Sequence, residues 1–157
     1  MRSVWILMVL GWLLGVSCQR KEDVEPQRVS CDDFVKSGDE ANRLILGRWQ
    51  WEQTFTQLRG MTSPKIETPQ SEGYSEELVF KPEGIVEVYR NGQLVETRRY
   101  IIQDVPGEMT LYIHFTELNG TAMPRSVDLP LLRLCTDRLT LNHTYNDTGG
   151  DITYKRI

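Results

Sequence analysis

The residues Leu46-Gly47-Arg48-Trp49-Gln50-Trp51-Glu52-Gln53-Thr54-Phe55-Thr56 decide the fold of this chain. The stretch alternates with a period of two, so that Trp49, Trp51, Gln53 and Phe55 share one face and the other face is polar. Such alternation, with aromatic and β-branched residues, is typical of a half-buried β-strand. Two indoles on one face need a thick partner layer, so the strand must lie against a second sheet or inside a barrel. Gly47 leaves room for a close approach of the backbone at the start of the strand.

Seven further stretches have the length and alternation of strands, and glycine or proline marks most of the turns between them. They are Tyr74–Lys81, Ile85–Arg90, Gln93–Ile102, Glu108–Phe115, Ser126–Cys135, Arg138–Asn146 and Asp151–Ile157. About eight short strands at regular spacing predict an all-β fold, an antiparallel up-and-down β-barrel, with a two-sheet sandwich as the alternative. Leu58–Gly73 predicts a long loop. Ser30–Leu46 predicts a short helix or turn before the barrel, capped by Asp33 or Asp39.

The clearest hairpin surrounds Asn91-Gly92, because this dipeptide suits the two positive-φ positions of a type I′ turn. A two-residue turn places Val88 opposite Val95 and Val86 opposite Thr97, and this face continues to Arg99 and Ile101. An inward Arg99 could receive an anionic head group of a ligand. The alternatives are that Arg99 extends to the barrel mouth or that a bulge turns it outward.

The N-terminal residues 1–17 predict a secretory signal peptide, since Arg2 is followed by an apolar run that ends near Leu14. The run is shorter than the ~20 residues that a membrane-spanning helix needs. Leu14-Gly15-Val16-Ser17-Cys18 resembles a bacterial lipobox. This resemblance implies that the signal peptide is cleaved off before Cys18 and that Cys18 is acylated. An ordinary signal peptide with a chance cysteine is the alternative.

Residues 18–30 are polar and lack periodicity, so they predict a lipidated tether, and residues 31–157 are expected to form the barrel domain. Lys21-Glu22-Asp23 resembles the surface-export signal of some Gram-negative lipoproteins, although a solvated linker has the same composition. These features predict a lipid anchor in the bacterial outer membrane, with the domain periplasmic or surface-exposed. If Cys18 is acylated, Cys31 and Cys135 remain in an oxidising compartment and are expected to form a disulfide.

Several motifs in sequence order resemble the small lipocalin-like lipoproteins of Gram-negative bacteria. They are Leu46-Gly47-x-Trp49-x-Trp51, Leu78-x-Phe80-x-x-x-Gly84, Tyr89-Arg90-Asn91-Gly92 and Tyr154-Lys155-Arg156. The resemblance covers Leu46 to Ile157 and implies a lipocalin-type barrel. It also implies that Gly47, Trp49 and Arg156 close one end of that barrel, with the arginine packed across the tryptophan.

The sequence offers no constellation for catalysis, and we expect neither an enzyme, a cofactor nor a metal site. His114 and His143, the two histidines, fall on opposite faces of their strands, so a shared zinc site is not expected. Glu76 and Glu77 are neighbours in a strand and therefore point to opposite faces. The formal net charge is −4 with no basic run, which argues against binding of nucleic acid.

Two functions from different classes remain. The first is a lipid-tethered barrel that binds a small apolar or amphipathic molecule at the cell envelope. Its expected ligand-binding residues are Trp49, Trp51, Val88, Arg99 and His143. The second is a module with a filled core that binds another envelope protein. An eight-stranded barrel can be filled or can hold one small ligand. Bulky inward candidates favour filling, namely Trp49, Trp51, Phe55, Phe80, Phe115 and Tyr145, whereas slender Val86, Val88, Val95 and Thr97 favour space beside one hairpin.

Overall fold

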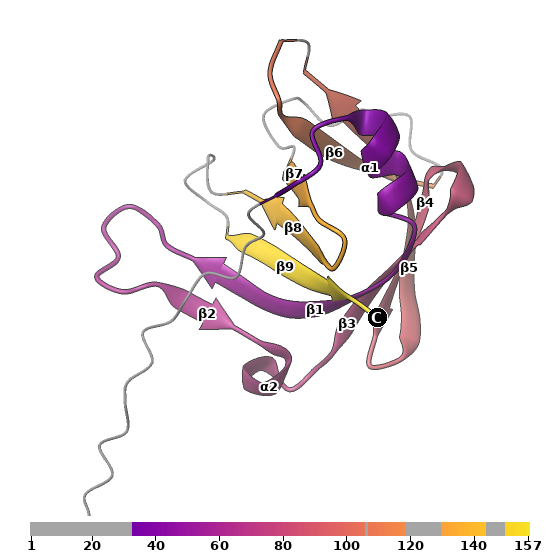
Figure 1. Ribbon diagram of the computed structural model, residues 1–157. Helices are drawn as coiled ribbons and strands as arrows, with labels where there is room; N and C mark the ends of the chain where they lie inside the picture. Colours follow the sequence, from indigo (N-terminus) through magenta and orange to yellow (C-terminus); the bar gives the residue numbers. More distant parts are fainter. Residues whose placement is uncertain (1–32, 106, 119–129, 144–149) are drawn as a thin grey trace, which may run out of the picture.

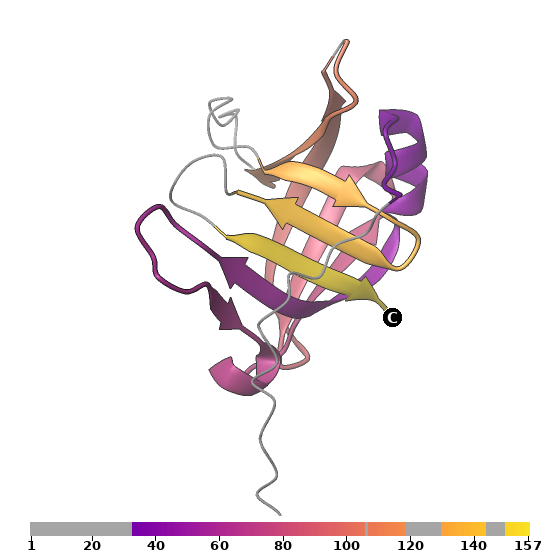
Figure 2. The same ribbon diagram turned by 60° about the vertical axis from the view of Figure 1, so that its left-hand side comes forward.

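The tryptophan-rich stretch forms strand β1, Gly47–Thr56, and the rest of the sheet is wound around it. The computed structural model describes residues 33–105, 107–118, 130–143 and 150–157. β1 pairs antiparallel with β3 along one edge and with β9 along the other, and this second pairing closes the sheet into an eight-stranded antiparallel barrel. Figures 1 and 2 show the closure, with β7, β8, β9 and β1 side by side. The predicted all-β barrel is confirmed.

The strands follow one another around the barrel in chain order. They are β3 (Glu76–Lys81), β4 (Ile85–Arg90), β5 (Gln93–Asp104), β6 (Leu111–Glu117), β7 (Leu131–Leu134), β8 (Arg138–Asn142) and β9 (Asp151–Arg156). A 3-10 helix, η1 (Pro82–Gly84), joins β3 to β4, and helix α1 (Gly38–Leu44) precedes β1. Asn91 and Gly92 have φ of 51° and 78°, so the expected turn between β4 and β5 is present.

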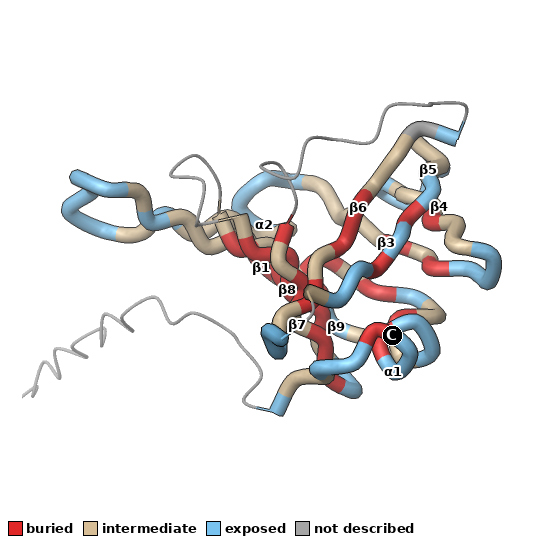
Figure 3. Tube along the Cα trace, turned by 90° about the horizontal axis from the view of Figure 1, so that it is seen from above, coloured by how far each residue is buried: buried red, intermediate tan, exposed pale blue. Residues whose placement is uncertain are grey.

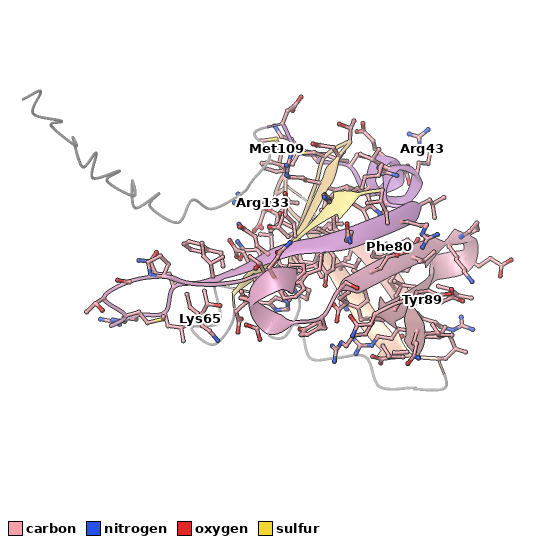
Figure 4. All side chains as sticks on the ribbon, turned by 90° about the horizontal axis from the view of Figure 1, so that it is seen from below. Arg43, Lys65, Phe80, Tyr89, Met109 and Arg133 are labelled. Carbon is pink, nitrogen blue, oxygen red and sulfur yellow. The ribbon has the colours of Figure 1, made fainter. Side chains whose placement is uncertain are left out.

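Two local predictions were wrong. The segment predicted as a loop, Leu58–Gly73, contains strand β2 (Lys65–Glu67) and helix α2 (Pro69–Glu72). β2 pairs with the last residues of β1 to form an arm, on which Figure 4 shows Lys65. The N-cap of α1 is Ser37, without a side-chain hydrogen bond, rather than Asp33 or Asp39. The predicted strand Ser126–Cys135 begins in residues outside the described ones, and its described part is β7.

A β-bulge at Glu52 changes which side chains of β1 face the barrel interior. Trp51 pairs with Tyr154, but Gln53 pairs with Thr153, so Glu52 has no residue opposite it on β9. One extra residue reverses the alternation beyond it. Thr54 therefore faces the interior and accepts a hydrogen bond from Nε1 of Trp51 at 3.1 Å. The prediction that Phe55 shares the face of Trp51 was wrong for this reason.

A second bulge lies in the β4–β5 hairpin. Tyr89 pairs with Leu94, whereas Val88 pairs with Glu96, which leaves Val95 as the extra residue of β5. The predicted pairs Val88–Val95 and Val86–Thr97 are consequently replaced by Val88–Glu96 and Val86–Arg98. All later residues of β5 are turned to the face opposite to the one predicted.

The two ends of the barrel differ. At one end, called the helix end, α1 lies beside the start of β1, and Ala41 and Ile45 are fully buried. The core cluster continues from there through the inward side chains of every barrel strand, including Trp49, Phe80, Ile113, Leu134 and Leu139. Figure 3 shows the buried stretches along the barrel strands, and Figure 4 labels Phe80 of β3. The opposite end, where β4 ends and β5 begins, is called the cavity end.

Candidate functional site

A cavity of about 570 Å³ lies inside the barrel at the cavity end. Its apolar walls are Leu78, Val86, Val88, Val95, Phe115, Pro130, Leu141 and Ile152, and its polar walls are Glu76, Arg90, Glu96, Arg98, His143 and Tyr154. These residues come from strands β3, β4, β5, β6, β8 and β9 and from the segments next to β7 and β8. The volume falls in the range of roughly 300–1,000 Å³ that is typical of small-molecule sites.

The slender side chains of one hairpin explain where the space lies. Val86 and Val88 of β4 point inward beside the cavity, and Val95 reaches it from β5. Thr97, which was predicted to join them, pairs with Glu87 on the outer face because of the bulge. The prediction of space beside this hairpin is therefore confirmed, but the predicted register of β5 was wrong.

A hydrogen-bonded carboxylate lies on one side of the cavity. The hydroxyl of Tyr154 donates to Oε1 of Glu76 at 3.0 Å, and Nη2 of Arg90 donates to Oε2 at 2.9 Å. Tyr154 is 3% exposed. Burial, followed by the charge of Glu76, raises the pKa of the Tyr154 phenol well above its usual value. Tyr154 therefore stays a neutral donor, and both carboxylate oxygens of Glu76 accept a hydrogen bond.

A second ion pair lies on β5. Glu96 and Arg98 are two residues apart and face the same side, opposite Val88 and Val86 respectively. The guanidinium of Arg98 donates from Nε and Nη2 to the two carboxylate oxygens of Glu96. This hydrogen bonding lowers the pKa of Glu96. The cavity thus contains two arginines, each already paired with a glutamate.

The prediction that Arg99 faces the interior was wrong. Arg99 pairs with Ile85 and Thr116 and is exposed, because the bulge at Val95 turns it outward. Arg98 takes the inward position instead, and Glu96 accompanies it on the same face. Alternation counted from the Asn91-Gly92 turn without a bulge predicts that Glu96 and Arg98 face outward, and this prediction was wrong for the same reason.

Neither predicted tryptophan lies on the cavity wall. Trp51 is 5% exposed and stacks on Tyr74, with the ring centroids 5.2 Å apart. The guanidinium of Arg90 lies over the Tyr74 ring of this stack, 4.6 Å from the ring centroid. Tyr74 therefore lies in contact with both Trp51 and Arg90, and it links Trp51 to the charged wall. Val88 and His143, the other two predicted ligand residues that face inward, do line the cavity.

The helix end is closed around Trp49, which is fully buried and donates from Nε1 to the carbonyl oxygen of Ile45 at 2.7 Å. The guanidinium of Arg156 lies 4.2 Å from the Trp49 ring centroid. It donates to the carbonyl oxygens of Thr136 at 2.7 Å and Leu46 at 3.0 Å, and also to that of Leu44. Burial lowers the pKa of Arg156 from its usual high value, but the guanidinium stays charged.

Gly47 is required at this closure. Its φ is +119°, and a Cβ added there would lie 3.2 Å from Nη1 of Arg156. A side chain would therefore strain the backbone and displace the arginine. The structure brings Gly47, Trp49 and Arg156 together in the arrangement that the lipocalin resemblance implies.

The histidines do not meet. His143 lines the cavity, whereas His114 lies on the outer face of β6 and hydrogen-bonds Gln103 at 2.9 Å. Burial lowers the pKa of both rings, so both are neutral near pH 7. Within the described residues, no three histidines, cysteines, aspartates or glutamates form a group that could hold a metal ion.

Several predicted features fall outside the described residues: the signal peptide, Cys18, the tether, Cys31 and Tyr145. The disulfide between Cys31 and Cys135 therefore stays a prediction. Sγ of Cys135 lies 3.1 Å from the carbonyl oxygen of Asp33, two residues beyond Cys31 in the chain. Among the described residues, no helix is both long and apolar enough to cross a bilayer.

Two further hollows lie outside the barrel. One, of about 770 Å³, lies between Asp33–Lys36, α1 and the turn after β7. The other, of about 380 Å³, lies between α1 and the outer faces of β5 and β6. Among these three hollows, which described residues line, the internal cavity combines walls from several barrel strands with paired charges, so we take it as the site. Comparison with family models, curated proteins and solved structures finds no match for this chain.

Proposed function

We propose that this chain is a membrane-anchored bacterial lipoprotein whose barrel binds one small apolar or amphipathic molecule at the cell envelope. The cavity inside the barrel carries the proposal. It is large enough for a small ligand, and its walls combine apolar side chains with polar groups that converge on it, as small-molecule sites do.

The organisation of the chain supports the same proposal. Trp49 and Arg156 fill the helix end, so space is concentrated at the opposite end of the barrel. A lipid on Cys18 would hold the barrel near the outer membrane, on its periplasmic or outer side, with residues 18–30 as the tether. Binding, rather than catalysis, is the activity we propose.

The anchor is tested separately from the cavity. Cells that make the full chain are grown with labelled palmitate, and the label is expected on the wild type and not on Cys18→Ser. Equal labelling of the two proteins would remove the lipoprotein part of the proposal.

The cavity is tested by titrating the mature chain carrying Cys18→Ser with an environment-sensitive hydrophobic dye, followed by displacement with unlabelled fatty acids and retinoid-like compounds. Saturable binding is expected. Val88→Trp should fill the cavity and weaken binding at least about tenfold, a change of about 1.4 kcal/mol.

Val79→Trp is the matched control, because Val79 lies on the outer face of β3 and does not line the cavity. It should leave binding unchanged, and both variants should keep the circular dichroism of the wild type. The absence of saturable binding across the panel would overturn the proposal in favour of a protein-interaction module. Equal binding by Val88→Trp and the wild type would show that the ligand site is elsewhere.

A further inference from the structure

The charged side chains of the cavity balance. Glu76 and Glu96 supply two negative charges and Arg90 and Arg98 supply two positive ones, while burial keeps His143 neutral. Each arginine has its own carboxylate: Arg90 donates to Glu76 at 2.9 Å, and Arg98 donates from two nitrogens to Glu96. The cavity therefore presents both signs of charge and no net charge.

These charges lie on one wall. Glu76 is the first residue of β3 and Arg90 pairs with it as the last residue of β4, and Glu96 and Arg98 follow on the neighbouring strand β5. The same strands also supply apolar Leu78, Val86, Val88 and Val95, and the remaining lining adds apolar Phe115, Pro130, Leu141 and Ile152 with the neutral polar groups of His143 and Tyr154. All four charges of the cavity thus gather on β3, β4 and β5, so a bound chain would lie against the apolar side chains and its head against this charged group.

The paired charged side chains can still bind a ligand. The side chains of Arg90, Arg98 and Glu96 are 51%, 42% and 38% exposed, so they face open space as well as each other. A guanidinium has five N–H donors, of which Arg98 uses those on Nε and Nη2 toward Glu96. Arg98 therefore has N–H donors left for an anion, and the Glu96 carboxylate beside it can bind a cation.

We propose that the ligand is a zwitterionic single-chain amphiphile, whose anionic group binds the arginines and whose cationic group binds Glu96. The inference rests on the proposed function of the cavity. A free carboxylate would have to displace a glutamate from its arginine or add an unbalanced negative charge to a half-enclosed site, and both cost free energy. A lone cation would have to displace an arginine from its glutamate or add an unbalanced positive charge. A head group with one negative and one positive charge adds no net charge, and it offers the arginines and Glu96 each an oppositely charged partner.

The test uses four amphiphiles with the same dodecyl chain, each below its micelle concentration, on the mature chain with Cys18→Ser. They are dodecylphosphocholine, dodecanoate, dodecyltrimethylammonium and dodecyl maltoside, and displacement of the bound dye reports affinity. Dodecylphosphocholine should bind at least about tenfold more tightly than each of the other three.

Two charge variants should redirect this preference. Glu96→Gln leaves Arg98 without its partner, so dodecanoate should become the tightest ligand. Arg98→Gln leaves Glu96 without its arginine, so dodecyltrimethylammonium should bind more tightly than it does to the wild type. Arg99→Gln, the adjacent residue on the outer face, is the matched control and should keep the order of the wild type. Unfolding midpoints of all variants are measured beside binding, and a redirected preference requires a folded protein.

The outcomes separate the two levels of the proposal. If no amphiphile displaces the dye and none binds directly, the proposed function fails. If amphiphiles bind but dodecanoate, the cation or the maltoside is tightest on the wild type, or if all four bind equally, only the zwitterion inference is overturned. The zwitterion inference would also be overturned if Glu96→Gln and Arg98→Gln ranked the four amphiphiles in the same order of affinity as the wild type.

Discussion

Arg156 at the helix end of the barrel and Arg98, one of the two arginines at the cavity end, have different surroundings. At the helix end, Arg156 lies over Trp49 and donates to three backbone carbonyl groups. At the cavity end, Arg98 donates to one neighbouring carboxylate and borders a space of about 570 Å³. Backbone carbonyls are fixed by the fold, whereas a side-chain carboxylate can turn toward a ligand. The arginine at the helix end therefore has fixed partners, whereas the arginine at the cavity end has a partner that can turn.

The strongest test of this contrast removes the indole at the helix end. Trp49→Ala deletes a fully buried side chain together with its hydrogen bond to Ile45 and its contact with Arg156. We expect the free energy of unfolding to fall by about 3–5 kcal/mol, as measured by urea denaturation. Trp49→Phe, which keeps most of the volume, should lose less. A loss below about 1 kcal/mol for the alanine variant would show that this end does not carry the stability of the barrel.

Arg156→Ala should have the next largest effect. It leaves the carbonyls of Leu44, Leu46 and Thr136 without their donor and uncovers the Trp49 ring. Hydrogen bonds to charged groups contribute about 1.5–3 kcal/mol, so we expect a loss of that order in urea denaturation. Arg156→Lys should recover only part of it, because an ammonium cannot reproduce the planar fork.

Lys155→Ala is the control for this position, since Lys155 is exposed on the same strand. It should stay within about 0.5 kcal/mol of the wild type. Equal stability of Arg156→Ala and Lys155→Ala would contradict the structural role of Arg156.

Tyr154→Phe tests the network that borders the cavity. The variant removes the donor to Glu76 and should cost about 1 kcal/mol at neutral pH. Because the pKa of Tyr154 is raised in the folded state, its contribution is full below about pH 10 and is lost as pH rises further. The wild type should therefore lose more stability than Tyr154→Phe between neutral pH and about pH 11.

Tyr89→Phe is the matched comparison, because its hydroxyl donates to Glu87 at 2.9 Å on the outside of the barrel. It should change stability at neutral pH by less than Tyr154→Phe does, as thermal unfolding at both pH values will show. Identical alkaline profiles for the wild type and Tyr154→Phe would mean that the phenol is not held protonated by the fold.

The smallest effect is expected from Arg99→Gln. Arg99 is exposed on the outer face, so the free energy of unfolding should change by less than about 0.5 kcal/mol. Arg98→Gln, one residue away, breaks the pair with Glu96 and should change dye binding as well. Binding that depends on Arg99 and not on Arg98 would contradict the bulge at Val95.

Short-range patterns in the sequence determined much of the fold. Alternation located every barrel strand, and Asn91-Gly92 fixed the turn of the main hairpin, because strand and turn preferences act over a few residues. The valines of that hairpin located the cavity. The lipocalin resemblance supplied the pairing of Arg156 with Trp49, residues more than one hundred positions apart.

Only the tertiary structure decided which side chains face the cavity. Each barrel strand must match two neighbours at once while the sheet closes with a fixed stagger, and the bulges at Glu52 and Val95 accommodate that requirement. One extra residue exchanges the two faces of a strand, so Arg98 and Glu96 replaced Arg99 in the cavity. The contact of Tyr154 with Glu76 spans 78 residues and arises the same way, because closure of the sheet, rather than any local preference, brings β9 next to β1 and within reach of β3.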